Sequence, residues 1–368
     1  MKPQVNFNRR AVLASLLPAA LLLDTHTARG EEDFGALYVP DEIDRAVNKG
    51  VDYLVSVKRP DGSVADHGHT IAMSSLAIMA MAAIGTQPGD KSARGEVMQA
   101  ALDYVLKDGN QDREGYFGGR DGSRMYGHGI TTLMLTEMLG MGASIEQNEK
   151  IHRTLNAAIK LILNAQSVRK TASSAGGWRY GPGSTDSDLS VSVWQLMALR
   201  SAKNDGLDVP SQAIEKAINY LKNSYTSQQR RGRNGGETIS GFSYTPGHHH
   251  PTFTMTAAGL LAMQVCGQYD SPMVRGASEW LLRNKPRNSE RFFFYGIYYY
   301  SQGMHQAGGK YAEEANKLVP ALLLDMQRSN GSWVARGGEE RNIGTVYSTA
   351  MAILSLSVRY HYLPIYQR

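Results

Sequence analysis

The sequence lacks several features that would define a small or membrane-embedded protein. It has one cysteine among 368 residues, Cys266, which excludes a disulfide within the chain and any cysteine-rich metal or iron–sulfur site in one chain. Charged residues make up 20% of the sequence, slightly below the usual level. No apolar run reaches the length of about 20 residues that a comfortable membrane span needs. The chain is nevertheless long enough to build a core without covalent staples.

The signatures of several function classes are also missing. No basic run is interleaved with aromatic residues, so we expect no nucleic-acid partner despite the net charge of +5. The sequence contains no Gly-x-Ser-x-Gly elbow, P-loop, dinucleotide fingerprint or His-Glu-x-x-His motif. We therefore expect no cofactor and no bound metal. The basic surface would allow peripheral contact with an anionic membrane, and a simply solvated surface is the alternative.

The first 30 residues have the pattern of an export signal. Arg9 and Arg10 precede the apolar run 14–23, and small residues around Ala28 offer a cleavage site. Paired arginines are typical of the twin-arginine route, with an ordinary secretory signal or a retained anchor as alternatives. We expect a signal peptide at 1–30, a linker at 31–40 and a single domain at 41–368, exported to the periplasm or cell envelope.

The chain is rich in internal repetition. About six times, a segment with helical periodicity ends near a Gly-rich turn with an aromatic residue, and a second, more apolar segment follows. The expected helix pairs are 43–57 with 70–84, 96–107 with 129–141, 150–166 with 190–203, 211–227 with 252–266, 272–284 with 292–307, and 311–327 with 345–359.

The two members of each pair differ in composition. The second segments are rich in Ala, Met and Leu with few charges, which is typical of helices buried on all sides. The first segments are striped, with charges such as Lys216 and Glu279 on one face. Two layers of about six hairpins predict an all-α fold, an (α/α)6 toroid or barrel. Closure is favoured over an open solenoid because the last segment ends apolar, without a polar capping repeat.

The turns between paired segments resemble a known repeat. Gln327, followed by Gly331 and Trp333, resembles the QW repeat of squalene–hopene and oxidosqualene cyclases, and Gln166 with Trp178 is a looser copy. Over 41–368 the chain resembles the prenyltransferase and squalene oxidase repeat superfamily, and especially its exported bacterial members with one toroid. The resemblance implies a terpenoid-cyclase-like α/α toroid. It does not fix the activity, because this fold hosts cyclases, protein prenyltransferase subunits and non-enzymatic binding domains.

One segment supplies candidate catalytic residues. Asp186 and Asp188 match the first two acids of the motif with which hopene-type cyclases protonate their substrate, whereas Leu189 replaces the third. The resemblance implies Asp188 as general acid, while capping of a helix N-terminus is the alternative role for both carboxylates. His128, after Gly127, is a candidate general acid or base that would project into the rim, with capping or packing as its alternative.

Aromatic and histidine residues are expected to line the central cavity. Tyr295, Tyr298 and Tyr299 share a helical face and would stabilise a carbocation, with packing between helices as the alternative. The starts of the inner helices gather on one rim of a closed toroid, so the histidines before them should converge there. The expected ligand-cavity residues are His67, His69, Trp178, Tyr180, His248, Tyr295, Tyr298 and Tyr299.

Two functions follow from these observations. The first is an exported terpene cyclase or mutase, an isomerase or lyase that takes a small hydrophobic isoprenoid into its cavity. The alternative is a non-catalytic toroid that binds a lipid, glycan or peptide, favoured by the incomplete acid motif and by a length about half that of hopene-type cyclases. A glycan-active α/α barrel would need a carboxylate pair across the cavity. The sequence leaves open whether the protein is an enzyme, its ligand and its oligomeric state.

Overall fold

The computed structural model describes residues 39–226, 239–248 and 250–367. These residues form helices and no strands, with three isolated bridges in the turns. The predicted signal peptide at 1–30 and most of the predicted linker lie outside the described residues. Within the described chain, no helix combines the length and the apolar composition that a membrane crossing requires.

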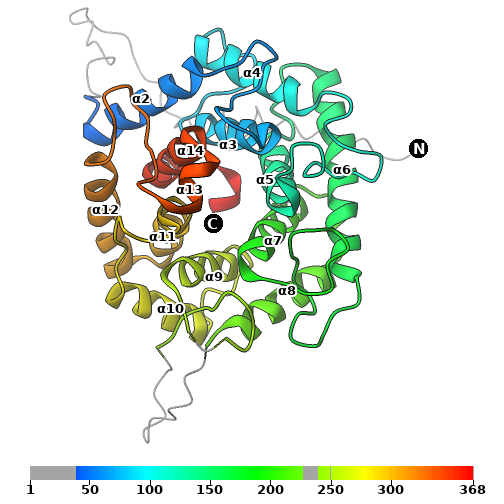
Figure 1. Ribbon diagram of the computed structural model, residues 1–368, viewed down its shortest axis with the longest axis vertical. Coiled ribbons are helices and arrows are strands. Elements are labelled where there is room, and N and C mark those ends of the chain that lie inside the picture. The colour runs from blue at the N-terminus through cyan, green and yellow to red at the C-terminus, as the bar shows by residue number, and fades with distance from the viewer. Residues whose placement is uncertain (1–38, 227–238, 249, 368) are drawn as a thin grey trace, which may run out of the picture.

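Twelve helices of the described chain are arranged in two concentric layers (Figure 1). The outer layer contains α2 (Glu42–Ser56), α4 (Ala93–Val105), α6 (Ile145–Ser167), α8 (Ser211–Ser224), α10 (Pro272–Arg283) and α12 (Gly309–Leu324). The inner layer contains α3 (Thr70–Ala82), α5 (Arg124–Glu137), α7 (Leu189–Asn204), α9 (Phe253–Val265), α11 (Phe293–Ala307) and α14 (Thr345–Leu356). A short helix, α13 (Gly338–Ile343), precedes α14.

The inner helices form a closed ring. Each one contacts the next in the order α3, α5, α7, α9, α11 and α14, and α14 packs against α3. Figure 1 shows the same closure, with the outer helices around it. The predicted (α/α)6 toroid is therefore confirmed, and the predicted helix pairs correspond to the observed hairpins.

Burial explains why the two layers differ in composition. Every residue of α9 is buried, as is every residue of α3 after Thr70. Such a helix can carry apolar residues all round. The outer helix α2 instead buries residues three and four apart, including Val47, Val51 and Leu54, so that one stripe faces the core.

The glutamines of the QW-like turns join neighbouring hairpins. Gln166 Nε2 donates to the Gly176 carbonyl of its own turn at 2.9 Å and to the Ala213 carbonyl of α8 at 2.9 Å. Gln327 Nε2 makes the same contact with its own turn at 2.9 Å and with Ala46 of α2 at 2.8 Å. Because α2 belongs to the first hairpin, the Gln327 contact closes the ring.

A third glutamine makes the equivalent contact although its turn contains no tryptophan. Gln111 Nε2 donates to the carbonyls of Gly115 at 3.0 Å and Thr154 of α6 at 2.9 Å. These turns require glycine because they press against the next outer helix. At Gly331 the φ angle is +87°, and a Cβ would lie 2.2 Å from the Lys49 carbonyl oxygen.

The toroid has two unlike ends. The end we call the long-loop end carries the connections from outer to inner helices: 57–69, 106–123, 168–188, the described residues between α8 and α9 (225–226, 239–248 and 250–252), 284–292 and 325–344. The end we call the short-turn end carries the reverse connections: 83–92, 138–144, 205–210, 266–271 and 308. All six inner helices begin at the long-loop end, which gathers their positively polarised N-termini there. The C-terminal segment 357–367 packs against the short-turn end, where Leu363 and Ile365 are buried.

Aromatic side chains of α7 and α11 fill the centre of the inner ring. Trp194 stacks on Tyr298, with ring centroids 5.8 Å apart and planes at 8°, and meets Tyr299 edge-on. The Tyr298 hydroxyl is hydrogen-bonded to that of Tyr366 in the C-terminal segment. Tyr298 and Tyr299 are fully buried, so these two residues fill the centre, whereas the sequence predicted that they line an open cavity.

Candidate functional site

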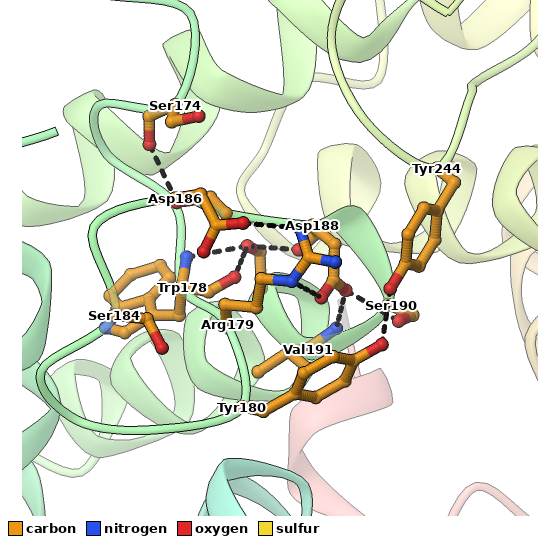
Figure 2. Close-up of polar contacts among 12 residues, drawn as sticks. Ser174, Trp178, Arg179, Tyr180, Ser184, Asp186, Asp188, Ser190, Val191 and Tyr244 are labelled. Atoms are coloured by element: carbon orange, nitrogen blue, oxygen red, sulfur yellow. Dashed lines mark hydrogen bonds and ion pairs between the residues drawn. The ribbon is translucent and has the colours of Figure 1, made fainter. Parts of the chain in front are cut away.

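The third turn presents a polar cluster at the long-loop end (Figure 2). Trp178 anchors this turn, because its buried indole Nε1 donates to the Ile162 carbonyl of α6 at 2.8 Å. The Trp178 carbonyl also accepts from the Asp188 amide at 2.9 Å, in an isolated antiparallel bridge. Held at both sides, the turn directs Arg179 and Tyr180 toward the start of α7 and the fourth loop.

Asp188 is the N-cap of α7. Its Oδ1 accepts from the Val191 amide at 2.9 Å and from the Ser190 hydroxyl at 2.6 Å. Its Oδ2 lies 3.7 Å from Arg179 Nε, and the side chain is 0% exposed. Burial raises the pKa of Asp188, and these hydrogen bonds and Arg179 offset that effect only in part. The carboxylate therefore serves the helix terminus and the arginine.

Arg179 connects that carboxylate to two tyrosines. Its guanidinium lies 5.2 Å from the ring centroid of Tyr180 and 5.8 Å from that of Tyr244. The two tyrosine hydroxyls are 2.5 Å apart, and Figure 2 shows them pointing toward one another. Both rings are half-buried. Burial raises the pKa of Tyr244 well above its ordinary value, so this phenol is neutral at physiological pH.

Ser190 links the cluster to α5 and α11. Its hydroxyl is hydrogen-bonded to the Tyr126 hydroxyl, and its carbonyl accepts from the Tyr295 hydroxyl at 2.7 Å. The Tyr126 ring also lies 6.0 Å from the Tyr180 ring. Side chains from four hairpins thus converge on the start of α7.

Other carboxylates at this end cap inner helices across hairpin boundaries. Asp121 accepts from amides that start α3, Glu340 from amides that start α11, and Asp66 from amides that start α14. Glu340 is 1% exposed and accepts from the Tyr295 amide at 2.9 Å and the Phe294 amide at 3.1 Å. Burial raises its pKa. Each of these acids belongs to the loop of the following hairpin, so the loops interlock around the ring.

Part of the predicted site comes together in this arrangement. Asp188 and Tyr180 belong to the cluster directly, and Tyr295 joins it through Ser190. Asp186 lies at the surface, where its Oδ2 is 2.7 Å from Arg179 Nη1. The catalytic roles predicted for Asp186 and Asp188 stay predictions. The contact observed for Asp188 is the one that the alternative role requires, namely capping of the α7 N-terminus.

His128 lies elsewhere than expected. It is fully buried between α5 and α6, with Nε2 3.2 Å from the Ala158 carbonyl oxygen and its ring 5.5 Å from that of Tyr116. Burial lowers its pKa to about 4, because the charged imidazolium would lose its hydration there. The register of α5 turns this position toward the outer layer, whereas the sequence predicted that it projects into the rim.

The remaining predicted cavity residues are dispersed. The Trp178 indole faces α6 in the core, as described above. His67 and His248 are exposed, and His69 Nδ1 lies 2.9 Å from the Asp121 carbonyl oxygen. No contact recorded for the described residues links these histidines to Asp188. Within the same residues, no group of three or more His, Cys, Asp or Glu side chains is arranged to hold a metal ion.

Sequence reasoning missed four members of the cluster, namely Arg179, Tyr244, Tyr126 and Ser190, and it also missed Glu340 at the start of α11. The spacing of residues in the repeated turns could have pointed to Tyr244. Tyr180 follows the buried Trp178 by two positions, and Tyr244 follows the buried Phe242 by two positions. Aligning the turns on their buried aromatic residue would have paired the two tyrosines.

Solved structures share this architecture. The α-1,6-mannanase GH76A of Salegentibacter sp. HEL1_6 superposes with a TM-score of 0.58 at 8% identity, covering 86% of this chain and 99% of that one. An inactive variant of that enzyme in complex with α-1,6-mannotriose gives a TM-score of 0.58 at 9% identity, with coverage of 86% and 99%. A protein from Actinoplanes gives 0.50 at 14% identity, covering 87% and 100%. No protein-family model matches the chain, and no curated protein matches it.

The chain is an (α/α)6 toroid. At such low identity the likeness concerns the fold alone. The sequence analysis expected an isoprenoid cyclase with a small hydrophobic ligand, related to terpenoid cyclases and prenyltransferases. The solved mannanase structures of the same fold contradict this expectation. The mannanase toroids take a sugar ligand, as their bound mannotriose shows. In this chain, tyrosines fill the centre and Asp188 is committed to a helix terminus.

Proposed function

We propose that this toroid binds an oligosaccharide at its long-loop end without cleaving it. The observation that carries the proposal is the pair of half-buried tyrosines, Tyr180 and Tyr244, with the Arg179 guanidinium over both rings. The α-1,6-mannanases with the same fold, one of them bound to mannotriose, support a sugar as the class of ligand.

The chemistry of the cluster suits a neutral sugar. A pyranose ring offers C–H faces that pack on aromatic rings and hydroxyls that exchange hydrogen bonds with phenols and a guanidinium. The cluster is fixed in advance, because Asp188 and Asp186 hold Arg179 and the two phenols hold each other. Such preorganisation reduces the entropy lost on binding.

The carboxylates favour binding over hydrolysis. Most glycosidases need two carboxyl groups on either side of the scissile bond, about 5 to 9.5 Å apart and in reach of the substrate. Asp188 and Glu340 are both fully buried and accept hydrogen bonds from the backbone amides of inner helices. They hold the starts of α7 and α11 and are out of reach of a sugar at the surface.

Calorimetric titration of the purified protein with α-1,6-mannotriose and with cello- and chito-oligosaccharides tests the proposal. We expect at least one of these probes to bind. Tyr180→Ala and Tyr244→Ala should each weaken that binding about tenfold or more, which corresponds to about 1.4 kcal/mol. Tyr362→Ala is the matched control, because this tyrosine is 52% exposed at the short-turn end.

The outcomes separate the alternatives. The proposal would be overturned if Tyr362→Ala lost as much sugar affinity as Tyr180→Ala and Tyr244→Ala. It would also be overturned if no probe bound to the parent protein. Release of shorter sugars during incubation, detected by mass spectrometry, would turn the binding module into a hydrolase. In that case Asp188→Asn should abolish the release.

A separate expectation concerns export. Export of the chain through residues 1–30 stays a prediction, and cell fractionation with a Lys substitution of Arg9 and Arg10 would test it.

A further inference from the structure

Two histidines far apart in the sequence meet at the short-turn end. His305 lies near the end of α11, and His361 directly follows the 3-10 helix Ser357–Tyr360. Their Nε2 atoms are 3.3 Å apart and their ring centroids 5.0 Å apart. This separation is long for a hydrogen bond between them. It equals the spacing of about 3.3 Å expected for two nitrogens bound at about 2.0–2.1 Å to one tetrahedral zinc ion.

A small cavity adjoins the two imidazoles. Its volume is about 20 Å³, enough for one water molecule or one ion. Besides the two histidines, Ser357, Gln302, Gln306 and Tyr366 are among the residues that line it.

One residue that lines the cavity has a buried hydroxyl without a partner among the described residues. Ser357 is 5% exposed, and its hydroxyl has no hydrogen-bond partner among the described residues. A buried hydroxyl without a partner is costly, so an occupant of the cavity that contacts it is favoured. Gln306, whose Oε1 accepts from the Tyr269 hydroxyl at 3.3 Å, adds a second oxygen to the lining.

We propose that His305 and His361 bind a divalent transition-metal ion of the Zn²⁺ type in this cavity. Imidazole is a preferred ligand of such ions. No third His, Cys, Asp or Glu joins the pair within the described chain, so water and neutral oxygens such as that of Ser357 complete the coordination. The ion fastens the C-terminal segment to α11 and thereby holds the short-turn end shut.

The site is accessible for loading. His361 is exposed and His305 half-buried, which leaves a path for the ion from solvent. His361 has a φ angle of +55°, a left-handed conformation that asparagine tolerates better than most residues. His361→Asn therefore removes the imidazole with little change in the backbone.

The test is calorimetric titration of the tag-free, chelator-treated full chain with zinc chloride alone. We expect one ion per chain at this site, with binding weakened at least tenfold in both His305→Ala and His361→Asn. His152→Ala, an exposed histidine on α6, is the matched control and should bind like the parent. Zinc should also raise the melting temperature of the parent and leave that of the two cavity variants unchanged.

Circular dichroism of the metal-free variants verifies that they fold. If one of the two variants does not fold, the other is sufficient for the test. Absence of zinc binding to the parent would overturn the proposal, as would undiminished binding in a folded cavity variant. Sugar binding at the opposite end should be the same in all of these proteins, so this result stands apart from the proposed function.

Discussion

The two ends of the toroid solve the same structural problem in different ways. Both must cover the ends of six inner helices. At the long-loop end, each of several loops caps the inner helix of the preceding hairpin, with Asp121, Glu340 and Asp66 as examples. At the short-turn end, a single segment, 357–367, packs across with apolar residues and tyrosines.

The polar groups that could bind a sugar lie at the long-loop end, whereas the short-turn end is covered mainly by apolar residues and tyrosines of the C-terminal segment. The long-loop end collects positively polarised helix termini, buried carboxylates and partly exposed tyrosines in one place. The short-turn end is covered by the C-terminal segment 357–367. Sugar binding is therefore expected at the long-loop end only, and substitutions at the two ends should have separable effects.

The largest loss of stability is expected for Glu340→Ala at the long-loop end. The substitution strips two buried amides, those of Phe294 and Tyr295, of their acceptor. Unsatisfied buried donors of this kind should lower the free energy of unfolding by about 3 to 4 kcal/mol. Glu339→Ala is the control, because that side chain is exposed and its ion pair with Arg291 contributes little. Urea unfolding measures both, and similar values would contradict the capping role.

Acidification should weaken the protein through His128. The unfolded chain takes up a proton at this residue below about pH 6.5, but the folded chain only near pH 4. The free energy of unfolding should thus fall between pH 6.5 and pH 4, by about 3 kcal/mol from this group. His128→Gln should remove that share of the pH dependence. Parallel slopes for parent and variant in urea unfolding at pH 7, 5.5 and 4.5 would rule the effect out.

A substitution at the short-turn end should affect stability alone. Leu363 is buried where the C-terminal segment packs against the ring, and Leu363→Ala should cost about 2 to 3 kcal/mol. Sugar affinity, measured by calorimetry below the melting temperature, should remain that of the parent. A loss of affinity comparable with that of Tyr180→Ala would mean that the two ends are coupled.

The smallest effect concerns the two aspartates of the third loop. Asp188→Ala removes the N-cap of α7 and should cost about 1 to 2 kcal/mol. Asp186→Ala removes only a surface ion pair with Arg179 and should cost less than about 0.5 kcal/mol. Thermal unfolding compares them directly. Equal costs would show that Asp188 has no special place at this helix terminus.

Local periodicity was enough to predict the architecture. The inner helix α9 carries no charged residue because it is buried on all sides, whereas the outer helix α2 buries one stripe only. The QW-like turns around Gln166 and Gln327 also marked real joints between hairpins. These features depend on neighbouring residues, so the sequence displays them.

The site depends on partners that lie far away along the chain. Glu340 caps a helix about 45 positions earlier, from the short helix α13 that the repeat pattern did not indicate. Tyr244 meets Tyr180 from the next hairpin. His128 was misplaced because its helix register, and not the glycines around it, decides which layer it faces. Such pairings arise only when the ring closes.

The seam between the last and first hairpins has a topological consequence. Gln327 binds α2 as Gln166 binds α8, and Arg359 near the end of the described chain is 2.6 Å from Asp41 near its start. The joint between the last and the first hairpin is thus built like the joint between two consecutive hairpins. The closed ring does not depend on which hairpin is synthesised first. A circularly permuted chain, in which a linker joins Gln367 to Val39 and new ends are opened between α3 and α4, should adopt the same fold.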